Sequence, residues 1–508
     1  MRDDSILILG AGIMQIPAIK AAKQLGYRVF VADVNTEAPA ISLADEFRHI
    51  DLIDKHAIAE EAVRLRKEHN LSAVFTAGTD FSATVAYAAT AAGLPGIDYT
   101  VAMTASNKIL MRRAFSEAGV PSPSFYPVKT RREALEACMN LNFPVVIKPV
   151  DSMGARGVVK ISSIDDEQHI IEAVETAVAA SGSCEAIVEE FIDGPEFSLD
   201  ALVHDGEVTI CGFADRHIYF PPYFIEMGHT IPTAFDEDVQ AEVVEVFIRG
   251  IKAIGIDNGA AKGDMKYSSK KGAMVGEIAA RLSGGFMSGW TYPYHSGIDL
   301  TGEAVKVAAG LAPGSLVPSL NLISAERAAV SIPGRVASIE GVEAAEAVEY
   351  VRDVFLHAES GARVVFPVNN VQKCANCISA ADDYDIAVAA AEEAVKALLI
   401  RLEPGDFETA AFIRRESYDW VPDAYVLTRE ADIAFIISLG LDAGGMLPDL
   451  GHEAAVDWHG LGMSEAILRL KSSIDCSDDD FTADFWKAFL RGGIQGGLWY
   501  LETEAVSR

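Results

Sequence analysis

The chain has few cysteines. Only six occur among 508 residues, and their scattered positions do not form the spacing of a disulfide framework. This usage indicates a reducing compartment. One Cys-x-x-Cys motif, Cys374-Ala375-Asn376-Cys377, stands without a second cysteine pair or a thioredoxin-like context. We therefore interpret it as two ordinary strand or turn thiols rather than a zinc or redox site.

Positive charge and long apolar runs are also scarce. The 42 lysines and arginines face 74 acidic residues, which leaves a net charge of −32. This balance excludes a basic nucleic-acid-binding surface, so any anionic ligand needs a local cluster of cations. The longest uncharged run, "FSATVAYAATAAGLPGI", predicts a soluble helix and a turn. The amino end leads from Met1 directly into a strand, without a signal-peptide pattern. We predict a cytoplasmic, multidomain protein with no membrane or nucleic-acid partner.

The first hundred residues alternate strands and helices. The stretch "SILILGAG" predicts a buried strand that enters a glycine turn, and "MQIPAIKAAKQLG" predicts a helix that ends at Gly26. Two further strands, "YRVFVADVN" and "LSAVFTAG", follow. This alternation is typical of a parallel sheet with right-handed crossovers, so residues 1–104 are predicted to form a Rossmann-like domain.

The glycine turn resembles a dinucleotide fingerprint only in part. Gly10 and Gly12 have the right spacing, and Asp33 lies near the position that would hold a ribose. Gln15 replaces the third glycine, which normally allows close packing of helix and strand. We favour a tight turn in a Rossmann-like sheet. The alternatives are an NAD site and a helix amino terminus that helps to bind a small anionic substrate group.

The rest of the chain changes pattern twice. Residues 105–315 mix helices with strands that look antiparallel, and residues 316–403 predict short strands with one closing helix, "DIAVAAAEEAVKALLIRL". Four of the five tryptophans lie after Pro404. Residues 404–508 are therefore predicted to form an extra, mostly helical unit with its own core, or an oligomer contact.

Basic residues gather around one unusual hairpin sequence, "FPVVIKPVDSMGARGVVKI". Lys148 ends a buried strand, and Arg156 sits in the glycine loop that follows. Lys108 starts a helix upstream. A flexible hairpin tip would explain the glycines, but a lysine at the end of a buried strand needs a partner charge. A polyphosphate ligand explains both features.

Acidic residues gather in a second hairpin, "KGDMKYSSKKGAMVGEIAARLSGG". Asp264 and Glu277 occupy its two arms and can point to one side, which suits a hard cation such as Mg²⁺. Arg281 would place a fork of donors beside the same ion, suited to a carboxylate or acyl phosphate. Each feature alone is more often a surface charge, an ion pair or a turn. Their occurrence together, in this order, favours a nucleotide site.

Five motifs together resemble the ATP-grasp enzymes over roughly residues 1–403. They are "NKILMRRAFSEAGVPSP", "FPVVIKPVDSMGARGV", "VEEFIDGPEFSLD", "GDMKY" and "GEIAARLSGG". The resemblance implies a multidomain α/β and α+β chain. Its parts would be a Rossmann-like pre-ATP-grasp domain (1–104), a two-lobed ATP-grasp domain (105–315, lid about 120–190), a small C-terminal α+β domain (316–403) and the extra unit (404–508). Within the family it is most similar to the carboxylate–amine ligases that join amino acids.

The resemblance also implies roles for single residues, with ATP and Mg²⁺ or Mn²⁺ as cofactors. Two lysines would contact the phosphates and the adenine face, residues 152–157 would form the mobile lid, and residues 189–192 would line the adenine slot. A last glutamate would hold the ribose hydroxyls. In chain order these positions are Lys108, Lys148, Ser152, Gly154, Arg156, Gly157, Glu189, Glu190, Ile192 and Glu196. Asp264 and Glu277 would bind the metal, and Arg281 and Lys266 are catalytic candidates.

Two positions depart from the family pattern. Many members carry Glu-x-Asn at the second metal carboxylate, and here the third position is Ala279, which leaves one side-chain ligand fewer. Asp264 replaces the commoner glutamate, with a shorter reach but the same chemistry. The substrate motif is Glu226-x-x-His229, predicted in a loop, where the carboxylate would hold an ammonium group and the imidazole would accept a proton from the amine. A surface glutamate and a satisfied histidine are the alternative.

We therefore predict an ATP-dependent carboxylate–amine ligase that forms an amide or peptide bond through an acyl phosphate and releases ADP and phosphate. Its substrates would be small molecules, with amino acids as the expected acid and amine. The alternatives are a bicarbonate-using carboxylase or carbamoyl-phosphate-synthase-like enzyme, an NAD-binding oxidoreductase and a catalytically silent nucleotide-binding module. The tryptophan-rich end leaves a homodimer open.

Overall fold

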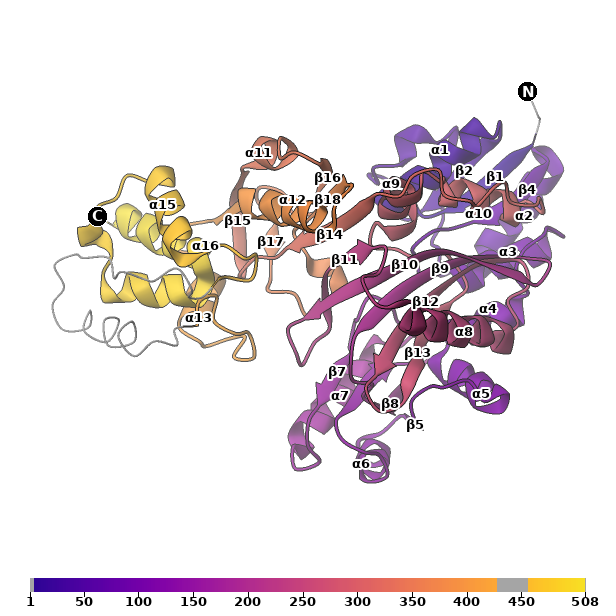
Figure 1. The fold of residues 1–508 in the computed structure, drawn as a ribbon, viewed down its shortest axis with the longest axis horizontal. Coiled ribbons are helices and arrows are strands. Elements are labelled where there is room, and N and C mark those ends of the chain that lie inside the picture. Colours follow the sequence, from indigo (N-terminus) through magenta and orange to yellow (C-terminus); the bar gives the residue numbers. More distant parts are fainter. Residues whose placement is uncertain (1–3, 427–455, 508) are drawn as a thin grey trace. The chain divides into compact units, whose positions relative to one another are not determined.

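The computed structural model describes residues 4–426 and 456–507, which fall into two compact units (Figure 1). The first unit consists of residues up to His217 together with His229–Ser324. The second unit consists of Ile218–Gly228 and the residues from Ala325 onward. Part of the predicted carboxy-terminal unit, residues 427–455, lies outside the described residues. Within the described ranges, no helix is both long and apolar enough to cross a membrane.

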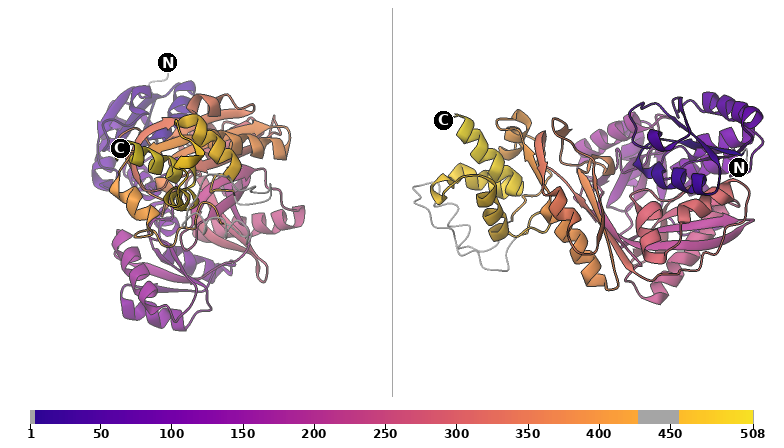
Figure 2. Two further views of the ribbon diagram at one scale, coloured as in Figure 1. Left: turned by 90° about the vertical axis from the view of Figure 1, so that its left-hand side faces the viewer. Right: turned by 90° about the horizontal axis from the view of Figure 1, so that it is seen from above.

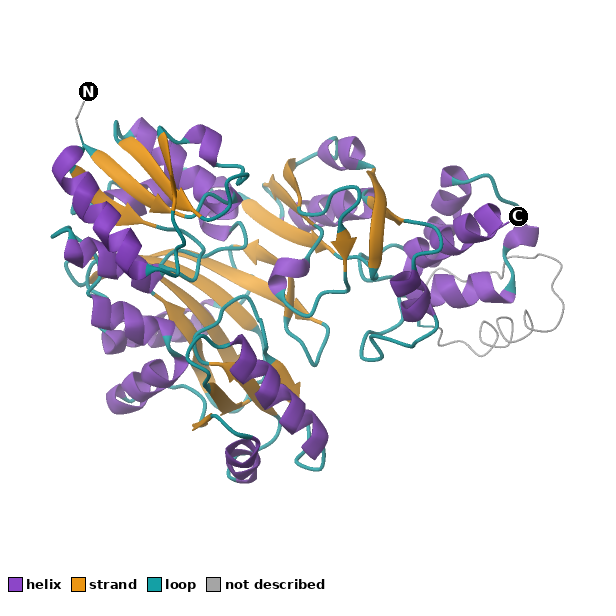
Figure 3. Cartoon of the chain, turned by 180° about the vertical axis from the view of Figure 1, so that it is seen from behind, coloured by secondary structure: helices purple, strands orange, loops and turns teal. Residues whose placement is uncertain are grey.

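The amino-terminal part of the first unit is a four-stranded parallel sheet in the order β3-β2-β1-β4, flanked by helices (Figure 3). Successive residues of β1 enter different cores, because Ile6 and Ile8 pack on one face and Leu7 and Leu9 on the other. A parallel sheet covered on both faces is the expected result of strand–helix alternation. The elements are β1 (Ser5–Leu9), α1 (Ile16–Gln24), β2 (Arg28–Asp33), β3 (Glu46–His49), α2 (Lys55–Glu68), β4 (Leu71–Phe75), α3 (Ser82–Ala91) and α4 (Tyr99–Ser106).

A smaller antiparallel sheet, ordered β5-β8-β6-β7, carries the glycine loop. Helices α6 and α7 pack against it, and a capping box between Thr130 and Glu133 starts α6. The glycine loop joins the paired strands β6 and β7, as the hairpin sequence predicted. The elements are α5 (Lys108–Ala118), β5 (Phe125–Val128), α6 (Arg131–Met139), β6 (Val145–Pro149), β7 (Val159–Ile161), α7 (Glu167–Ala180) and β8 (Ala186–Glu190).

The larger antiparallel sheet of the first unit has one apolar and one polar face. Along β9, Phe197, Leu199 and Ala201 are buried in a core that includes α8. Because side chains alternate along a strand, Glu196, Ser198 and Asp200 face the other way. The elements are β9 (Glu196–His204), β10 (Glu207–Tyr219), β11 (Ile225–Ile231), α8 (Glu237–Ile254), β12 (Gly259–Ser268), β13 (Gly272–Ala279), a π-helix (Met287–Thr291), α9 (Tyr292–Ser296) and α10 (Leu300–Ala308).

The second unit combines the three-stranded sheet β17-β15-β19 and the strands β14, β18 and β16 with helices. The predicted closing helix stops at Ala397, and the apolar run Leu399–Leu402 forms β19, which pairs with β15, so the expected helix is too long at its end. The elements are β14 (Ile323–Ala329), β15 (Gly334–Glu340), α11 (Val342–Glu346), β16 (Val351–Leu356), β17 (Arg363–Val364), β18 (Ala375–Ala381), α12 (Tyr384–Ala397), β19 (Leu399–Leu402), α13 (Phe407–Ile413), α15 (Met463–Ser473) and α16 (Ala483–Ser507).

The described carboxy-terminal helices share their core with the sheets of the second unit. Leu399 of β19 packs in one cluster with Leu470 of α15 and Phe485 of α16, and Trp499 packs in another with Phe366. Figure 2 shows the yellow helices α15 and α16 side by side. The tryptophan-rich tail is thus part of the second unit rather than a separate compact body. A boundary at residue 404 stays a proposal.

Candidate active site

Lys148 stands in a buried network with a carboxylate and an arginine. Its Nζ lies 2.5 Å from Oε2 of Glu189, on the neighbouring strand β8. The same carboxylate accepts Nε of Arg112 at 2.7 Å, and Arg112 also donates to the carbonyl of Gly276. Arg112 and Glu189 are 1% and 2% exposed. The partner charge that the sequence demanded for Lys148 is therefore supplied by the protein itself.

The network leaves Lys148 prepared for an anion. Burial would raise the pKa of Glu189, but the charges and hydrogen bonds of Arg112 and Lys148 outweigh it and lower the pKa to about 2. Burial lowers the pKa of Lys148, and although Glu189 opposes this, Arg112 and Lys108 add to it. One carboxylate is thus shared by two cations, with a third nearby. A phosphate would relieve this excess of positive charge.

Lys108 connects the glycine loop to the acidic hairpin. Asn107 caps α5 by accepting the backbone N–H groups of Ile109 and Leu110, which fixes Lys108 in the first turn. Its Nζ donates to the carbonyl oxygen of Ser152 at 2.8 Å and lies 3.3 Å from Oε2 of Glu277. The structure therefore brings together a predicted phosphate contact, the predicted lid and a predicted metal ligand.

The glycine loop adopts left-handed backbone conformations that favour glycine. Gly154 has φ +68° and Gly157 has φ +67°. A Cβ atom on Gly157 would lie 3.1 Å from Ala180 and from Pro149, so the loop also packs closely. Arg156 donates to the carbonyl of Met153 and forms an ion pair with Asp80, which follows β4.

Asp264 and Glu277 lie directly opposite each other in the register of β12 and β13. Asp264 accepts a hydrogen bond from Arg216 at 2.6 Å and pairs with Lys262. Burial would raise the pKa of Glu277, and Asp264 also raises it, but Lys108 and Lys262 bring it below its ordinary value. Two carboxylates on one polar face fit a divalent cation that also meets substrate phosphates.

Glu196 lies at the outer end of the same polar face. It accepts a hydrogen bond from Arg216 at 2.5 Å, and Nζ of Lys266 lies 3.3 Å away. Arg216 therefore bridges the predicted ribose ligand and the predicted metal ligand. Lys266 also lies 4.7 Å from the ring centroid of Phe191, and Lys160 lies 4.0 Å from the same ring. One aromatic ring thus contacts two cations next to the polar face.

The predicted adenine residues differ in exposure. Glu189 is occupied by Arg112 and Lys148, so its carboxylate is a structural partner of the lysine rather than a free adenine contact. The side chain of Glu190 accepts from Asn142 at 2.6 Å and pairs with Lys271 at 3.0 Å. Ile192 is 9% exposed. Adenine binding by these backbone groups stays a prediction.

Arg281 follows the end of β13 and reaches toward the amino-terminal domain. Its guanidinium donates to the carbonyl of Thr79 at 3.2 Å, to the carbonyl of Leu282 at 2.9 Å and to the sulfur of Met153 at 3.2 Å. Below it, Asp200 accepts the backbone N–H of Ser283 at 2.8 Å. The Arg281 turn is thus held from both sides.

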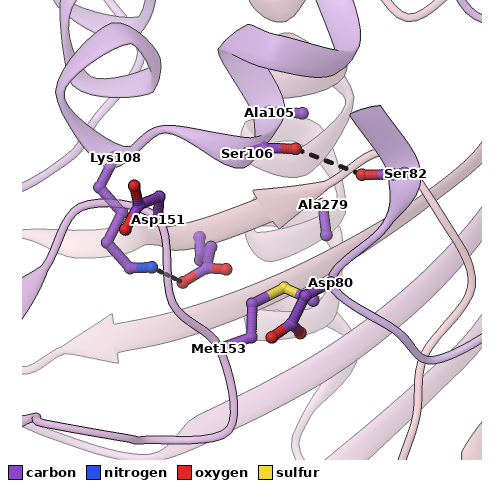
Figure 4. A pocket seen from close by; sticks show the side chains of 9 residues that line it. Asp80, Ser82, Ala105, Ser106, Lys108, Asp151, Met153 and Ala279 are labelled. Atoms are coloured by element: carbon purple, nitrogen blue, oxygen red, sulfur yellow. Dashed lines mark hydrogen bonds and ion pairs between the residues drawn. The ribbon is translucent and has the colours of Figure 1, made fainter. Parts of the chain in front are cut away.

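Figure 4 shows a pocket lined by Lys108, Glu277 and Met153 among others. Lys108 and its partner Glu277 form one wall, and Ser82 and Ser106, with their hydroxyls 3.3 Å apart, form another. Ala279 lines the pocket where many ATP-grasp proteins carry asparagine, so its methyl group leaves space beside the predicted metal ligands. The complete lining is Asp80, Ser82, Ala105, Ser106, Lys108, Asp151, Met153, Glu277 and Ala279.

The Glu226–His229 motif lies in strand β11, not in a loop as predicted. Residues three apart in a strand face opposite sides, so the two side chains do not form one pair. Nε2 of His229 lies 2.7 Å from the hydroxyl of Thr291, and the imidazole is buried. Glu226 belongs to the second compact unit, where its carbonyl accepts Nζ of Lys373.

Sequence reasoning missed several charged residues that the fold brings to the site. Arg112 could have been found, because it lies four residues after Lys108 in the same helix and thus on the same face. Arg216 and Lys262 had no local signal, because their importance depends on strand register. Asp80 and Asp200 likewise acquire their roles only through contacts distant in sequence.

The two cysteines of the Cys-x-x-Cys motif are buried thiols of or beside strand β18. Cys374 and Cys377 are 2% and 0% exposed. Burial raises the pKa of both thiols to about 12, which disfavours the reactive thiolate. These positions agree with the interpretation as ordinary strand thiols.

Two family models match the chain. An ATP-grasp domain matches residues 141–289, and L-amino acid ligase C-terminal domain 2 matches residues 328–403. The uncharacterized protein y4rH of Sinorhizobium fredii is 26% identical over 63% of this chain and 66% of its own length. The alanine–anticapsin ligase of Bacillus subtilis is 26% identical over 48% of this chain and 57% of its own length. The chain thus covers less than two thirds of the length of these relatives.

A solved structure extends the likeness in fold. The L-amino acid ligase of Bacillus licheniformis superposes with a TM-score of 0.68 at 21% identity, covering 79% of this chain and 100% of that one. At this identity the likeness concerns the fold. It confirms the predicted multidomain combination of α/β and α+β parts. Residues 141–289 therefore match an ATP-grasp domain, as the sequence motifs predicted, and residues 328–403 match L-amino acid ligase C-terminal domain 2.

Proposed function

We propose that this protein is an ATP-dependent carboxylate–amine ligase that joins two small molecules, with amino acids as the expected substrates. The observation that carries the proposal is one polar face on which cations and carboxylates alternate. Lys108 contacts Glu277, which lies opposite Asp264. Phosphoryl transfer needs little covalent chemistry from a protein, and this arrangement supplies positioning and charge neutralisation.

The phosphate-binding role falls to Lys148, Lys108 and the glycine loop. Lys148 lies close to two other cations, Arg112 and Lys108, so an incoming polyphosphate gains more there than it would beside an isolated lysine. Backbone N–H groups of a glycine loop can approach phosphate oxygens closely because no side chain intervenes. Closure of this loop would exclude water from a reactive acyl phosphate.

Asp264 and Glu277 would hold Mg²⁺, which would neutralise charge on the phosphates when bound. Around that position the chain supplies the fixed donors Lys262, Arg216 and Lys108. Arg281 would steady the carboxylate substrate and its acyl phosphate through two parallel donors. Its present partners include the carbonyl of Thr79, which keeps the guanidinium at the edge of the site.

His229 is the proposed acceptor for the proton of the attacking amine. The hydroxyl of Thr291 lies 2.7 Å from Nε2 and orients the imidazole. The proposed ligation has two steps. The substrate carboxylate takes the terminal phosphoryl group of ATP, the amine then forms the C–N bond, phosphate leaves with the former carboxylate oxygen, and the amine proton passes to a base. A role for Glu226 in holding an ammonium group, a homodimer and a cytoplasmic location stay predictions.

The NAD alternative is poorly supported by the glycine turn. Asp33 accepts the backbone N–H of Ala11 at 2.7 Å and that of Asn35 at 2.9 Å, so its oxygens brace the turn. The side chain of Gln15 lies against Gly10, 3.4 Å from where a Cβ would stand. The bicarbonate alternative shares the nucleotide site and differs in the acid that takes the phosphoryl group, which would be bicarbonate.

The test is phosphate release from ATP and Mg²⁺, scanned over pairs of amino acids and small carboxylates, with mass detection of products. Release that requires both an acid and an amine, with a condensed product and ADP, is expected. Release with bicarbonate alone would favour a carboxylase. Absence of both phosphate release and ATP binding would refute the proposal.

A further inference from the structure

The amino-terminal glycine turn has a connection to the candidate site that runs through Gln15. This side chain is only 1% exposed and makes two hydrogen bonds to one residue of a different loop. Its Nε2 donates to the carbonyl of Ala77 at 2.5 Å, and the N–H of Ala77 donates to its Oε1 at 3.1 Å. Gln15 thus pairs with Ala77 as a neighbouring strand would, across 62 positions of sequence.

The β4–α3 loop, residues 76–81, is held at its start by this clamp. Thr76 donates its hydroxyl to the carbonyl of Leu9 at 2.8 Å, which ties the same loop to the end of β1. The hydroxyls of Thr76 and Thr79 are 2.8 Å apart. Together these contacts fix the backbone of the loop up to Thr79.

Two arginines of the candidate site dock on this loop. Arg281 donates to the carbonyl of Thr79, and Arg156 of the glycine loop pairs with Asp80. The backbone of the turn after Arg281 also packs directly on the backbone of the β4–α3 loop, because a Cβ on Gly78 would lie 2.9 Å from Cα of Gly284. Gly78 has φ +62°, a second reason for glycine at this position.

We propose that Gln15 is a positioning residue, which sets the orientation of Arg281 and the closed position of the glycine loop by fixing the β4–α3 loop. The inference rests on the proposed function, since it assigns Gln15 to the geometry of that same site. This role explains why Gln15 stands where the dinucleotide fingerprint has a glycine: its side chain fills the turn and holds an adjacent loop. Glycine could not do this.

The first experiment replaces Gln15 by methionine, which has a similar length and makes neither hydrogen bond. We expect kcat for ligation to fall by about tenfold or more, because two hydrogen bonds of ordinary strength are lost and the docked arginines shift. The KM for ATP should change less than kcat, since Lys108 and Lys148 are untouched and only the contacts of the glycine loop to the phosphates are weakened. Phosphate release without condensed product should increase, because the loop no longer closes correctly.

The matched control is Gln495→Met. Gln495 of the second unit is also buried and makes the same kinds of bond, donating to the hydroxyl of Ser331 and the carbonyl of Ile400 at 2.9 Å. Its loss should lower the thermal stability but leave kcat and the ratio of product to phosphate unchanged. An equal loss of kcat in both variants would overturn the positioning role.

A second variant and a second readout keep the two proposals separable. Gly78→Ala pushes the same loop away from Gly284 without touching Gln15. If Gln15→Met does not fold, Gly78→Ala should show the same fall in kcat and the same increase in phosphate release without condensed product. Hydrogen exchange with a non-hydrolysable ATP analogue should show the 150–158 loop protected in the parent protein and not in Gln15→Met. Loop protection tests the role of Gln15 even if no ligation is detected. Absence of ligation would count against the proposed function but not against the role of Gln15. Equal protection in parent and variant would refute the role of Gln15.

Discussion

Each compact unit buries an arginine, and the two arginines have different partners. Arg112 in the first unit pairs with the carboxylate of Glu189, which in turn contacts Lys148. Arg491 in the second unit donates to the carbonyls of Val421 and Tyr418 and pairs with Asp423 at 3.3 Å, and its guanidinium lies 4.1 Å from the ring centroid of Phe412. Both side chains are almost fully buried.

The difference shows how to separate structural from functional burial of charge. Arg491 satisfies backbone carbonyls and contacts Asp423, a partly exposed carboxylate that also pairs with Arg415. Arg112 acts on another charged side chain at the candidate phosphate site. A buried polar group is therefore informative about function through what its partner touches, not through its burial alone.

The largest effect should come from removing each arginine. Arg112→Met leaves Glu189 paired with Lys148 alone, so we expect a loss of about 3–5 kcal/mol in stability and strongly weakened ATP binding. Arg491→Met should also destabilise, but ATP affinity should stay unchanged. Urea unfolding followed by far-ultraviolet circular dichroism reports on both units, and tryptophan fluorescence reports mainly on the second unit, which contains Trp420, Trp458, Trp486 and Trp499. Calorimetric ATP titration gives the affinity. Equal loss of affinity in both variants would contradict the distinction.

The next effect concerns carboxylates. Glu277→Gln should lower Mg²⁺-dependent turnover by about a hundredfold, since one charge of the proposed metal pair is lost. The control is Glu340→Gln in the second unit, where Glu340 accepts from Arg401 at 2.9 Å and touches no candidate site residue. Turnover measured as a function of Mg²⁺ concentration should change only in the first variant. A similar Mg²⁺ dependence in parent and Glu277→Gln would argue against this ligand.

The smallest effect depends on pH. Burial raises the pKa of Asp200 from 3.8 to about 6, although the Ser283 hydrogen bonds and nearby cations oppose it. Between about pH 4 and 6 the folded protein keeps a proton that the unfolded chain has released, so stability falls as pH rises through this window. Asp200→Asn retains an acceptor for Ser283 and should stabilise by about 2–3 kcal/mol above pH 6.

The stability gained in Asp200→Asn should shrink as pH falls from 6 to 4, as measured by calorimetry.

The stability of Glu189→Gln relative to the parent protein should depend on pH in the opposite direction. Its folded pKa of about 2 lies below the ordinary value of 4.5, so its stabilisation is present above pH 4.5 and disappears as pH falls toward 2. Gln495→Met in the second unit should cost the same at every pH, because no titrating group is removed. A pH-independent gain in Asp200→Asn would show that its carboxylate is not perturbed.

Local patterns were sufficient for many parts of the site. Asn107 and Lys108 encode a helix start through capping, and the hairpin around Asp264 and Glu277 follows from two strands joined by a short turn. The same reasoning wrongly placed Glu226 and His229 in a loop, because an extended run with glycine and proline nearby is compatible with either a strand or a loop. It also extended the closing helix into β19, since an apolar run of this kind suits both structures.

The sequence by itself determined the alternating core of the amino-terminal domain, the position of Lys148 at a strand end, the glycine loop and the opposed carboxylates. These depend on residue type and on periods of two or 3.6 residues, which neighbours in the chain express directly. Only the tertiary structure decided that Arg112 pairs with Glu189 across 77 positions and that Gln15 clamps Ala77. Such contacts depend on strand register and on how layers pack, and no local pattern specifies which distant polar group will satisfy a buried one.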